Sequence, residues 1–340
     1  MSVLPGEPPA PFTLLGPPVL SRAAVNRDER VRTDVERQIA GWPKSRLVVV
    51  DAEGRTPVQW RDDPSAGFEV GDAGTWDVAF GSGGRLCTRP TSGDAPPEGA
   101  VLLGEADGVA YWAVRGAIDL GTDDPAEWID LRMAGAALDA LGAGLFTTAV
   151  AALNWHDSAR FCPRDGTPTR PEQAGWHRIC EHGHEDYPRT DPAVICLVHD
   201  GGTGASARML LSRNVGWPEG RFSVQAGFVE AGESLEACVR REIEEETGAV
   251  VRDIGYLGSQ AWPFPRSLMI GFQAEADPDV PLRPAEGEIA EAMWVTRDEL
   301  RAALARGDWS GRGDDAARLL RLPGKVSIAR SMLEAWAAHG

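Results

Sequence analysis

The spacing of carboxylates between Gly227 and Ala249 constrains this chain more than any other feature. Glu242, Glu245 and Glu246 stand at positions i, i+3 and i+4 of a segment with helical character. In a helix this spacing places the three side chains on one face, about a turn apart. Like charges at such separations repel, so a folded chain keeps them together only where something offsets the repulsion. A divalent cation does so, because hard cations such as Mg²⁺ select carboxylate oxygen. A solvated acidic helix face is the alternative.

The three glutamates lie in a frame of glycines, an arginine and apolar residues. From Gly227 to Ala249 the chain reads GFVEAGESLEACVRREIEEETGA. This order resembles the signature of the Nudix hydrolases: G, five residues, E, seven residues, R-E-apolar, one residue, E-E, one residue, G-apolar. Ala249 in the last apolar position is the weakest match. The resemblance implies a loop–helix–loop whose helix carries divalent metals that bridge a diphosphate, while water attacks one phosphorus.

Length and charge narrow the class of protein. At 340 residues the chain is long enough for two domains and a small module. The net charge of −17 argues against a nonspecific nucleic-acid-binding surface, because phosphate contacts need clustered Lys and Arg. A local basic groove stays compatible with that charge. The five cysteines are odd in number and widely spaced, which does not indicate a disulfide framework.

The sequence favours a cytoplasmic location. The first twenty residues have no basic region and no proline-free apolar core, so no signal peptide is expected. The most apolar stretch, 133–152, contains Asp139, three glycines and two threonines. We therefore expect a buried helix pair there rather than a membrane span.

Apolar runs between turn residues predict the secondary structure. Strands are expected at 47–50, 75–80, 109–114, 193–199, 207–212, 251–260, 268–276 and 293–295. Helices are expected over the glutamate-rich segment and at 128–155, 298–306 and 327–338. Strands that flank a central helix, with another helix at the end, indicate an α/β sandwich.

A second motif follows the glutamate-rich segment. Residues 259–269 read SQAWPFPRSLM, in which two prolines around two aromatics form a rigid, apolar, non-helical ledge. A structural turn with core aromatics is the alternative. The motif resembles the S-Q-P-W-P-F-P, x-S signature of the NADH pyrophosphatase (NAD-capped RNA hydrolase) subfamily, with Ala261 in place of the first proline. That subfamily cleaves the pyrophosphate of NAD(H) into AMP and the mononucleotide.

The resemblance also implies a fold and a domain organisation. We expect an α/β protein: a Nudix α/β/α sandwich with a mixed sheet, preceded by a Nudix-like α/β domain and a short, degenerate zinc-ribbon-like module. The expected segments are a Pro-rich arm at 1–22, the N-terminal domain at 23–156, the ribbon at 157–190 and the catalytic domain at 191–340. The family usually dimerises, so a homodimer is expected.

For the catalytic site, the resemblance implies a carboxylate cluster that binds Mg²⁺ or Mn²⁺, two or more ions per site. The implied metal ligands are Glu242, Glu245 and Glu246, the backbone of Ala226, and Glu288. In the family pattern E-x-x-E-A-x-W the first acid is the ligand, so Glu291 is expected to be a surface charge. Glu246, with Glu245 and Glu242, is expected to be catalytic, and spacing does not decide which of them is the general base. Arg241 is expected to anchor a glutamate rather than to touch substrate.

The implied substrate pocket combines a loop, two aromatics and a backbone contact. The loop residues are Gln260, Ala261, Trp262, Pro263, Phe264, Pro265, Arg266 and Ser267. Phe228 and Tyr187 correspond to aromatics that stack on a base, which needs only a π-face; Tyr187 is equally compatible with a core position. Ala329 is expected to supply a late backbone contact.

The zinc ribbon of the subfamily, C-x-x-C repeated after about fourteen residues, is damaged here. Cys162 and Cys180 remain, and Asp165 and Gly183 replace the other two cysteines. His182 or His184 can substitute, giving for example Cys162, Asp165, Cys180 and His184, since Zn²⁺ accepts N, S and O ligands. Such a set binds more weakly than four thiolates. We favour the alternative, a ribbon that keeps its shape by packing without stable zinc.

The sequence therefore predicts metal-dependent hydrolysis of NAD(H), with NAD-capped RNA as a further substrate that presents the same bond. A broader dinucleotide or ADP-ribose pyrophosphatase and a non-catalytic Nudix-like ligand sensor are the alternatives. The S-Q-x-W-P-F-P loop argues against the former. The intact glutamates argue against the latter, because a sensor needs no metal cluster.

Overall fold

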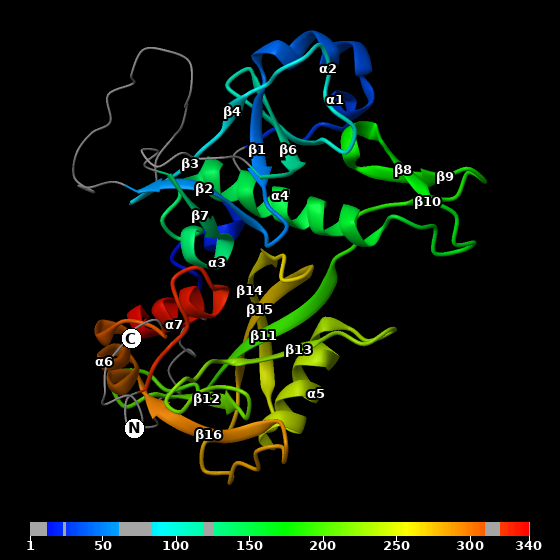
Figure 1. The fold of residues 1–340 in the computed structure, drawn as a ribbon. Coiled ribbons are helices and arrows are strands. Elements are labelled where there is room, and N and C mark those ends of the chain that lie inside the picture. The colour runs from blue at the N-terminus through cyan, green and yellow to red at the C-terminus, as the bar shows by residue number, and fades with distance from the viewer. Residues whose placement is uncertain (1–11, 23–24, 61–82, 118–125, 310–319, 340) are drawn as a thin grey trace, which may run out of the picture. The chain divides into compact units, whose positions relative to one another are not determined.

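The computed structural model describes residues 12–22, 25–60, 83–117, 126–309 and 320–339. The chain clusters into two compact units, drawn as ribbons in Figure 1. The C-terminal unit comprises Met1–Pro18, Asp191–Gln260 and Leu268–Gly340, and the N-terminal unit comprises Val19–Thr190 and Ala261–Ser267. The predicted strand at 75–80 and residues 1–11 of the predicted arm lie outside the described residues.

The C-terminal unit is built on a six-stranded sheet of order β14-β15-β11-β12-β16, with β13 paired to β11. Its strands are β11 (Asp191–His199), β12 (Arg208–Asn214), β13 (Gln225–Phe228), β14 (Arg252–Trp262), β15 (Ser267–Glu275) and β16 (Ile289–Thr296). Its helices are α5 (Leu235–Thr247), α6 (Arg297–Arg306) and α7 (Ile328–Ala338). The predicted α/β fold is confirmed. Strand β16 is longer than the predicted 293–295, because its pairing with β12 is a long-range interaction that local sequence does not show.

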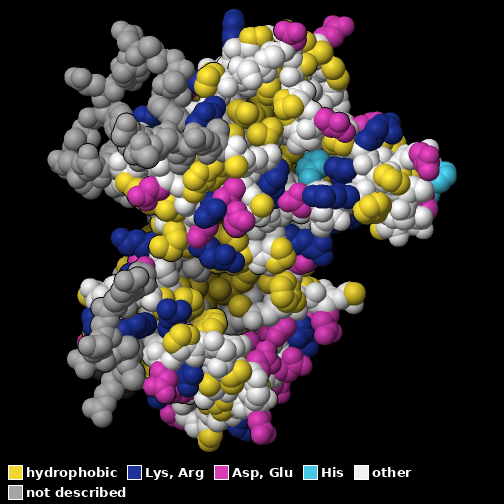
Figure 2. Space-filling model, viewed as in Figure 1, with side chains coloured by type: hydrophobic (Ala, Val, Ile, Leu, Met, Phe, Trp, Pro, Cys, Tyr) yellow, Lys and Arg dark blue, Asp and Glu magenta, His cyan; other side chains and the backbone are white. Residues whose placement is uncertain are grey.

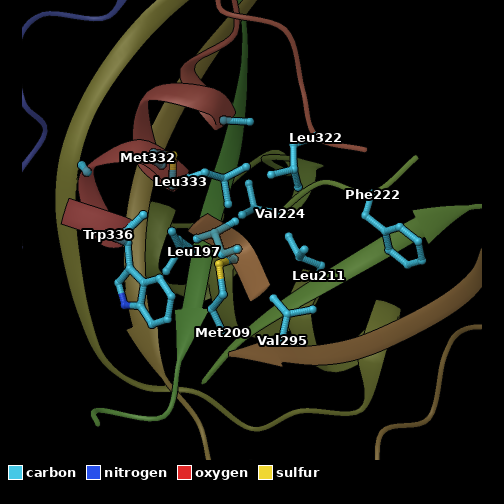
Figure 3. Packing of buried hydrophobic residues seen from close by; sticks show 14 of the residues in the cluster. Leu197, Met209, Leu211, Phe222, Val224, Val295, Leu322, Met332, Leu333 and Trp336 are labelled. Carbon is cyan, nitrogen blue, oxygen red and sulfur yellow. The ribbon is translucent and has the colours of Figure 1, made fainter. Parts of the chain in front are cut away.

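Apolar side chains on both faces of β11 explain its continuous apolar sequence. Val194, Cys196 and Val198 belong to a core cluster with the buried face of α5. Ile195 and Leu197 point to the opposite face and pack with α6 and α7. Figure 3 shows this second cluster, in which Leu197, Met209 and Leu211 of the sheet lie against Met332, Leu333 and Trp336 of α7. Helices on opposite faces of one sheet give the α/β/α layering.

The described residues of the N-terminal unit form three small sheets, of orders β4-β1-β6-β5, β3-β2-β7 and β10-β9-β8. The strands are β1 (Arg46–Val50), β2 (Arg55–Trp60), β3 (Gly84–Leu86), β4 (Arg89–Pro90), β5 (Val101–Ala106), β6 (Val109–Arg115), β7 (Ala126–Asp130), β8 (Thr169–Glu172), β9 (His177–Cys180) and β10 (Glu185–Asp186). The helices are α1 (Glu29–Thr33), α2 (Val35–Gly41), α3 (Leu131–Ala134) and α4 (Ala140–Ser158), with 3-10 turns η1 (Val19–Ser21), η2 (Trp42–Lys44) and η3 (Gln173–Gly175). The strands predicted at 47–50 and 109–114 are therefore present as β1 and β6.

The helix predicted over 128–155 is wrong at its start. Trp128 lies in β7, opposite Pro57 of β2. Helices begin only at two aspartates: Asp130 caps α3 and Asp139 caps α4, each by accepting a backbone N–H bond. Much of the apolar stretch at 133–152 is buried in α4. Within the described part of the chain, no helix combines the length and apolarity that crossing a membrane requires.

Candidate active site

Local sequence fixes both ends of the glutamate-rich helix α5. The Ser234 hydroxyl accepts a hydrogen bond from the Ala237 N–H and caps the N-terminus. At the other end Gly248 adopts φ 73°, a left-handed conformation that glycine reaches without steric cost. The box glutamates therefore project from a helix whose bounds its own residues define.

Arg241 ties the loop before α5 to the helix. Its Nε and Nη2 donate to the two carboxylate oxygens of Glu233, each at 2.8 Å, and Nη2 also donates to the Phe228 carbonyl at 3.0 Å. Its Nη1 donates to Glu242 at 2.8 Å and to Glu245 at 3.1 Å. The Arg241 guanidinium lowers the pKa of Glu233 to about 2. The predicted anchoring role of Arg241 is confirmed.

Gly227 allows a carboxylate to lie directly against the backbone of β13. A Cβ atom at this position would overlap the carboxyl group of Glu242. In β13, Gly227 is paired with Val194 and the preceding Ala226 with Ile195 of β11. Any side chain at residue 227 would therefore displace Glu242, so the glycine is required by packing around the carboxylate.

Glu246 is the most unusual of the glutamates. Its side chain comes from the buried face of α5 and is only 7% exposed. Its Oε2 atom has no hydrogen-bond partner among the described residues. Burial first, and then the charges of Glu242 and Glu288, raise the pKa of Glu246 to about 8. A buried carboxylate oxygen without a donor, close to two other acids, has the chemistry of a cation ligand.

Glu242 and Glu288 complete this acidic cluster. Burial raises the pKa of Glu242, against the opposing effect of Arg241, and the charges of Glu245 and Glu288 raise it further. Glu288 immediately precedes β16, where its N–H donates to the Ala285 carbonyl and its own carbonyl accepts from Val215. The structure thus brings three sequence-predicted acids from two separate elements, α5 and the approach to β16, into mutual electrostatic contact.

Glu245 is placed differently from Glu242 and Glu246. Its side chain is 61% exposed and bonded to Arg241. It lines a shallow pocket of about 490 Å³ together with Arg241, Glu244, Gly248 and Arg283. Figure 2 shows acidic side chains gathered over the part of the surface where Figure 1 draws α5. Glu245 therefore faces solvent, whereas Glu242 and Glu246 face the interior.

The predicted substrate residues of the C-terminal unit differ in accessibility. Phe228 ends β13 with its side chain 60% exposed, as a stacking platform requires. Gln260 is fully buried, and its Nε2 donates to the Val326 carbonyl at 3.1 Å. Ala329 is buried in the first turn of α7, where its N–H donates to the Ser327 hydroxyl. Gln260 thus connects β14 to the segment that leads into α7.

The remaining loop residues, 261–267, cluster with the N-terminal unit. The rings of Trp262 and Phe264 meet edge to face at 4.9 Å, and the Arg132 guanidinium lies 3.6 Å from the Phe264 ring centroid. The Pro263 carbonyl accepts from Asn154 at 3.4 Å. These contacts order the aromatic ledge that the two prolines predict.

Tyr187 also lies in the N-terminal unit, and a histidine covers one of its faces. The rings of Tyr187 and His177 stack at 4.9 Å with an interplanar angle of 12°. Tyr187 is 44% exposed, and His177 is 3% exposed. The Tyr187 hydroxyl donates to the Glu185 carboxylate at 2.8 Å. The sequence did not single out His177, because the stacking arises from the pairing of β9 with β10 and from no local motif.

The degenerate ribbon gathers the mixed ligand set. One ligand atom from each of Cys162, Asp165, Cys180 and His184 lies within 4.8 Å of all the others. His184 Nδ1 is 2.8 Å from Asp165 Oδ2, and His182 Nδ1 is 3.1 Å from the same oxygen. Hydrogen bonds from Thr167 hold the pKa of Asp165 well below its usual range. The carboxylate is therefore ionised, as a metal ligand must be.

Comparison with known families agrees with these motifs. Three family models match: the NUDIX domain at residues 189–313, the NADH pyrophosphatase zinc ribbon domain at 157–184, and the NADH pyrophosphatase-like rudimentary NUDIX domain at 44–155. The NAD-capped RNA hydrolase NudC of Mycobacterium tuberculosis is 49% identical over 96% of this chain and 97% of its own length. The human mitochondrial NAD(P)H pyrophosphatase NUDT13 is 35% identical over 70% of this chain and 71% of its own length. The chain belongs to the NADH pyrophosphatase family of Nudix hydrolases.

Proposed function

We propose that this chain hydrolyses the pyrophosphate bond of NAD(H) to AMP and NMN(H), and removes the NAD cap from the 5′ end of RNA. The observation that carries the proposal is the buried Glu246 Oε2, unpartnered among the described residues and close to the charges of Glu242 and Glu288. The activities named for the two relatives, an NAD-capped RNA hydrolase and an NAD(P)H pyrophosphatase, support the choice of substrate.

The proposed resident ions are Mg²⁺ or Mn²⁺. Carboxylate oxygens are the ligands these hard cations prefer, and in the described part of the chain no arginine bonds to Glu246 Oε2. The proposed ligands are the Ala226 carbonyl and the carboxylates of Glu242, Glu245, Glu246 and Glu288. The exposed position of Glu245 suits an ion that is also open to substrate.

The proposed mechanism divides the work between cations and carboxylates. Bound cations would neutralise the anionic pyrophosphate, stabilise the departing phosphate and make a water more acidic. Glu246 is the essential carboxylate, and one of Glu242, Glu245 and Glu246 accepts the proton of the attacking water. Arg241 keeps the loop and helix in register by holding Glu233 on one side and Glu242 and Glu245 on the other.

For the substrate, we propose that Phe228 and Tyr187 each offer a ring on which a base can stack, and that loop residues 261–267 and the Ala329 backbone contact the substrate. The side chain of Gln260 supports the site without touching substrate, because it is fully buried and donates a hydrogen bond to the Val326 carbonyl. We further propose a homodimer in the cytoplasm. A broader dinucleotide or ADP-ribose pyrophosphatase is the alternative. The partly buried acidic cluster disfavours a non-catalytic sensor, because a sensor needs no metal ligands.

In the ribbon we propose weak zinc binding by Cys162, Asp165, Cys180 and His184. The four ligand atoms converge, and this geometry favours zinc binding more strongly than the sequence alone does. Replacement of two thiolates by a carboxylate and an imidazole keeps the site weaker than a four-cysteine ribbon. The four protein ligands would leave no open position on the ion, so the zinc would be structural.

The catalytic proposal predicts the effect of Glu246→Gln. Loss of an essential carboxylate should reduce kcat for NADH by on the order of 10²- to 10⁴-fold. The assay follows AMP and NMNH release in Mg²⁺ or Mn²⁺ from NADH, NAD⁺, ADP-ribose and NAD-capped RNA. Glu291→Gln is the matched control, since Glu291 is an exposed strand residue 3.7 Å from Arg213. Equal rates for wild type and Glu246→Gln would contradict the assignment of Glu246 to a metal site. A preference for ADP-ribose would favour the broader pyrophosphatase activity.

The raised pKa of Glu246 predicts how stability depends on pH without metal. The ordinary pKa of a glutamate is 4.5, and that of Glu246 in the folded protein is about 8. Between pH 4.5 and about pH 8, folded Glu246 therefore keeps a proton that the unfolded chain releases. Stability should therefore fall as pH rises through that window, and the loss should be complete above about 8. In EDTA, Glu246→Gln should melt a few degrees above wild type at pH 8.5 and close to it at pH 4.5. A difference that is constant with pH would contradict burial of the charge.

The zinc proposal predicts different effects for two neighbouring histidines. Zinc affinity, measured by competition with a chromophoric chelator, should fall for His184→Ala and stay near wild type for His182→Ala. The reason is that His184, and not His182, belongs to the set of four converging ligand atoms. Absence of zinc binding by the wild type, or equal losses in both variants, would show that the ribbon is held by packing alone.

A further inference from the structure

Two tryptophans form a partly exposed pair on the C-terminal unit. Trp217 lies in the loop after β12, and Trp309 follows α6. Their ring centroids are 5.0 Å apart at an interplanar angle of 60°. The Arg221 guanidinium lies 5.9 Å from the centroid of the Trp309 ring and donates to the Trp309 carbonyl at 3.3 Å. Neither tryptophan is fully buried.

Hydrogen bonds hold the backbone at both tryptophans and the indole of Trp309. Asn214 forms a turn in which its side chain accepts from Gly216 and its carbonyl accepts from Trp217, both at 2.9 Å. On the other side, Trp309 donates its backbone N–H to Leu322 at 3.0 Å and its indole N–H to Arg321 at 2.9 Å. The pair is therefore ordered before any ligand arrives, which lowers the entropic cost of binding.

The loop that carries Trp217 begins beside the acidic cluster. The Val215 N–H donates to the Glu288 carbonyl at 2.8 Å, and Asn214 lies opposite Ile289 in the pairing of β12 with β16. Trp217 is two residues further along the chain. The loop that carries Trp217 is thus bonded to the backbone of Glu288, one of the proposed metal ligands.

An arginine accompanies the tryptophan pair, although the net charge of the chain is −17. Arg221 stands opposite Arg321 in an isolated backbone bridge. Among the described residues Arg221 has no carboxylate partner, and the Trp217 indole N–H has no hydrogen-bond acceptor. The Arg221 guanidinium therefore lies beside a partly exposed indole and is held there by its bond to the Trp309 carbonyl. Aromatic faces combined with arginine are how proteins hold single-stranded nucleic acid without sequence preference.

We propose that Trp217, Trp309 and Arg221 form a binding surface for single-stranded RNA, which takes the nucleotides that follow the NAD cap. The indoles stack on bases and Arg221 contacts a phosphate. This inference rests on the proposed function, because it concerns the part of a capped RNA that free NAD(H) lacks. It gives the enzyme a means of distinguishing the two substrates outside the pyrophosphate site.

The test compares both substrates in full-length variants. Trp217→Ala should lower kcat/KM for a short NAD-capped RNA by about 5- to 150-fold, the effect expected from losing one base-stacking contact. It should leave kcat/KM for NADH unchanged. Trp217→Phe should recover most of the activity on capped RNA, because stacking needs only a π-face. Tyr256→Ala is the matched control: Tyr256 is 62% exposed on β14 and also meets an aromatic ring edge to face.

A binding measurement keeps the inference testable apart from catalysis. Binding of the capped RNA is measured in a Glu246→Gln background, with and without Trp217→Ala or Arg221→Gln. Arg221→Gln should reduce the slope of log K against log salt by about 0.7, as expected for one phosphate contact on a single strand. Unchanged RNA affinity in both variants would contradict the proposed RNA-binding surface. Equal losses of kcat/KM for NADH and for capped RNA would contradict it as well. If wild type cleaves neither substrate, the proposed function fails, and the binding data still decide about the surface.

Discussion

The catalytic unit depends on a buried carboxylate oxygen, Glu246 Oε2, for which the described residues supply no hydrogen-bond donor. Desolvation and the nearby charges of Glu242 and Glu288 raise the pKa of Glu246 to about 8. Such an arrangement costs stability unless a cation offsets it. The neighbouring structure accommodates it: Gly227 leaves room for the Glu242 carboxyl group, and Arg241 forms ion pairs with Glu233 and Glu242. The repulsion that remains around Glu246 is left to the proposed metal ions.

The local features of this unit could be predicted from sequence because nearby residues determine them. Arg241 was expected to anchor a glutamate, and it holds Glu233 in two hydrogen bonds. The predicted helix at 327–338 begins at its capping residue Ser327, and the one predicted at 298–306 starts one residue early, after the capping box of Thr296. The apolar run at 193–199 predicted β11, because a strand that is buried on both faces is apolar at successive positions.

Features that depend on long-range pairing could not be predicted. Trp128 lies in a strand because β2 supplies its partner, whereas the alanine-rich sequence that follows favours helix. Gln260 was expected to line a pocket, and only the fold shows its side chain bonded to Val326. The stacking of His177 on Tyr187 and the edge-to-face contact of Trp217 with Trp309 likewise have no sequence signature. The domain boundaries at 156 and 190 and the substrate contacts stay predictions.

The central claim is that the Glu246 cluster is a cation site, and direct metal binding tests it. Mn²⁺ titration followed by electron paramagnetic resonance reports free ion without requiring turnover. Wild type should remove Mn²⁺ from solution, and Glu246→Gln should weaken that binding by at least about tenfold, the lower end of what loss of even an outer-shell partner costs. Glu291→Gln should titrate like wild type. The same Mn²⁺ affinity in Glu246→Gln and wild type would contradict the account.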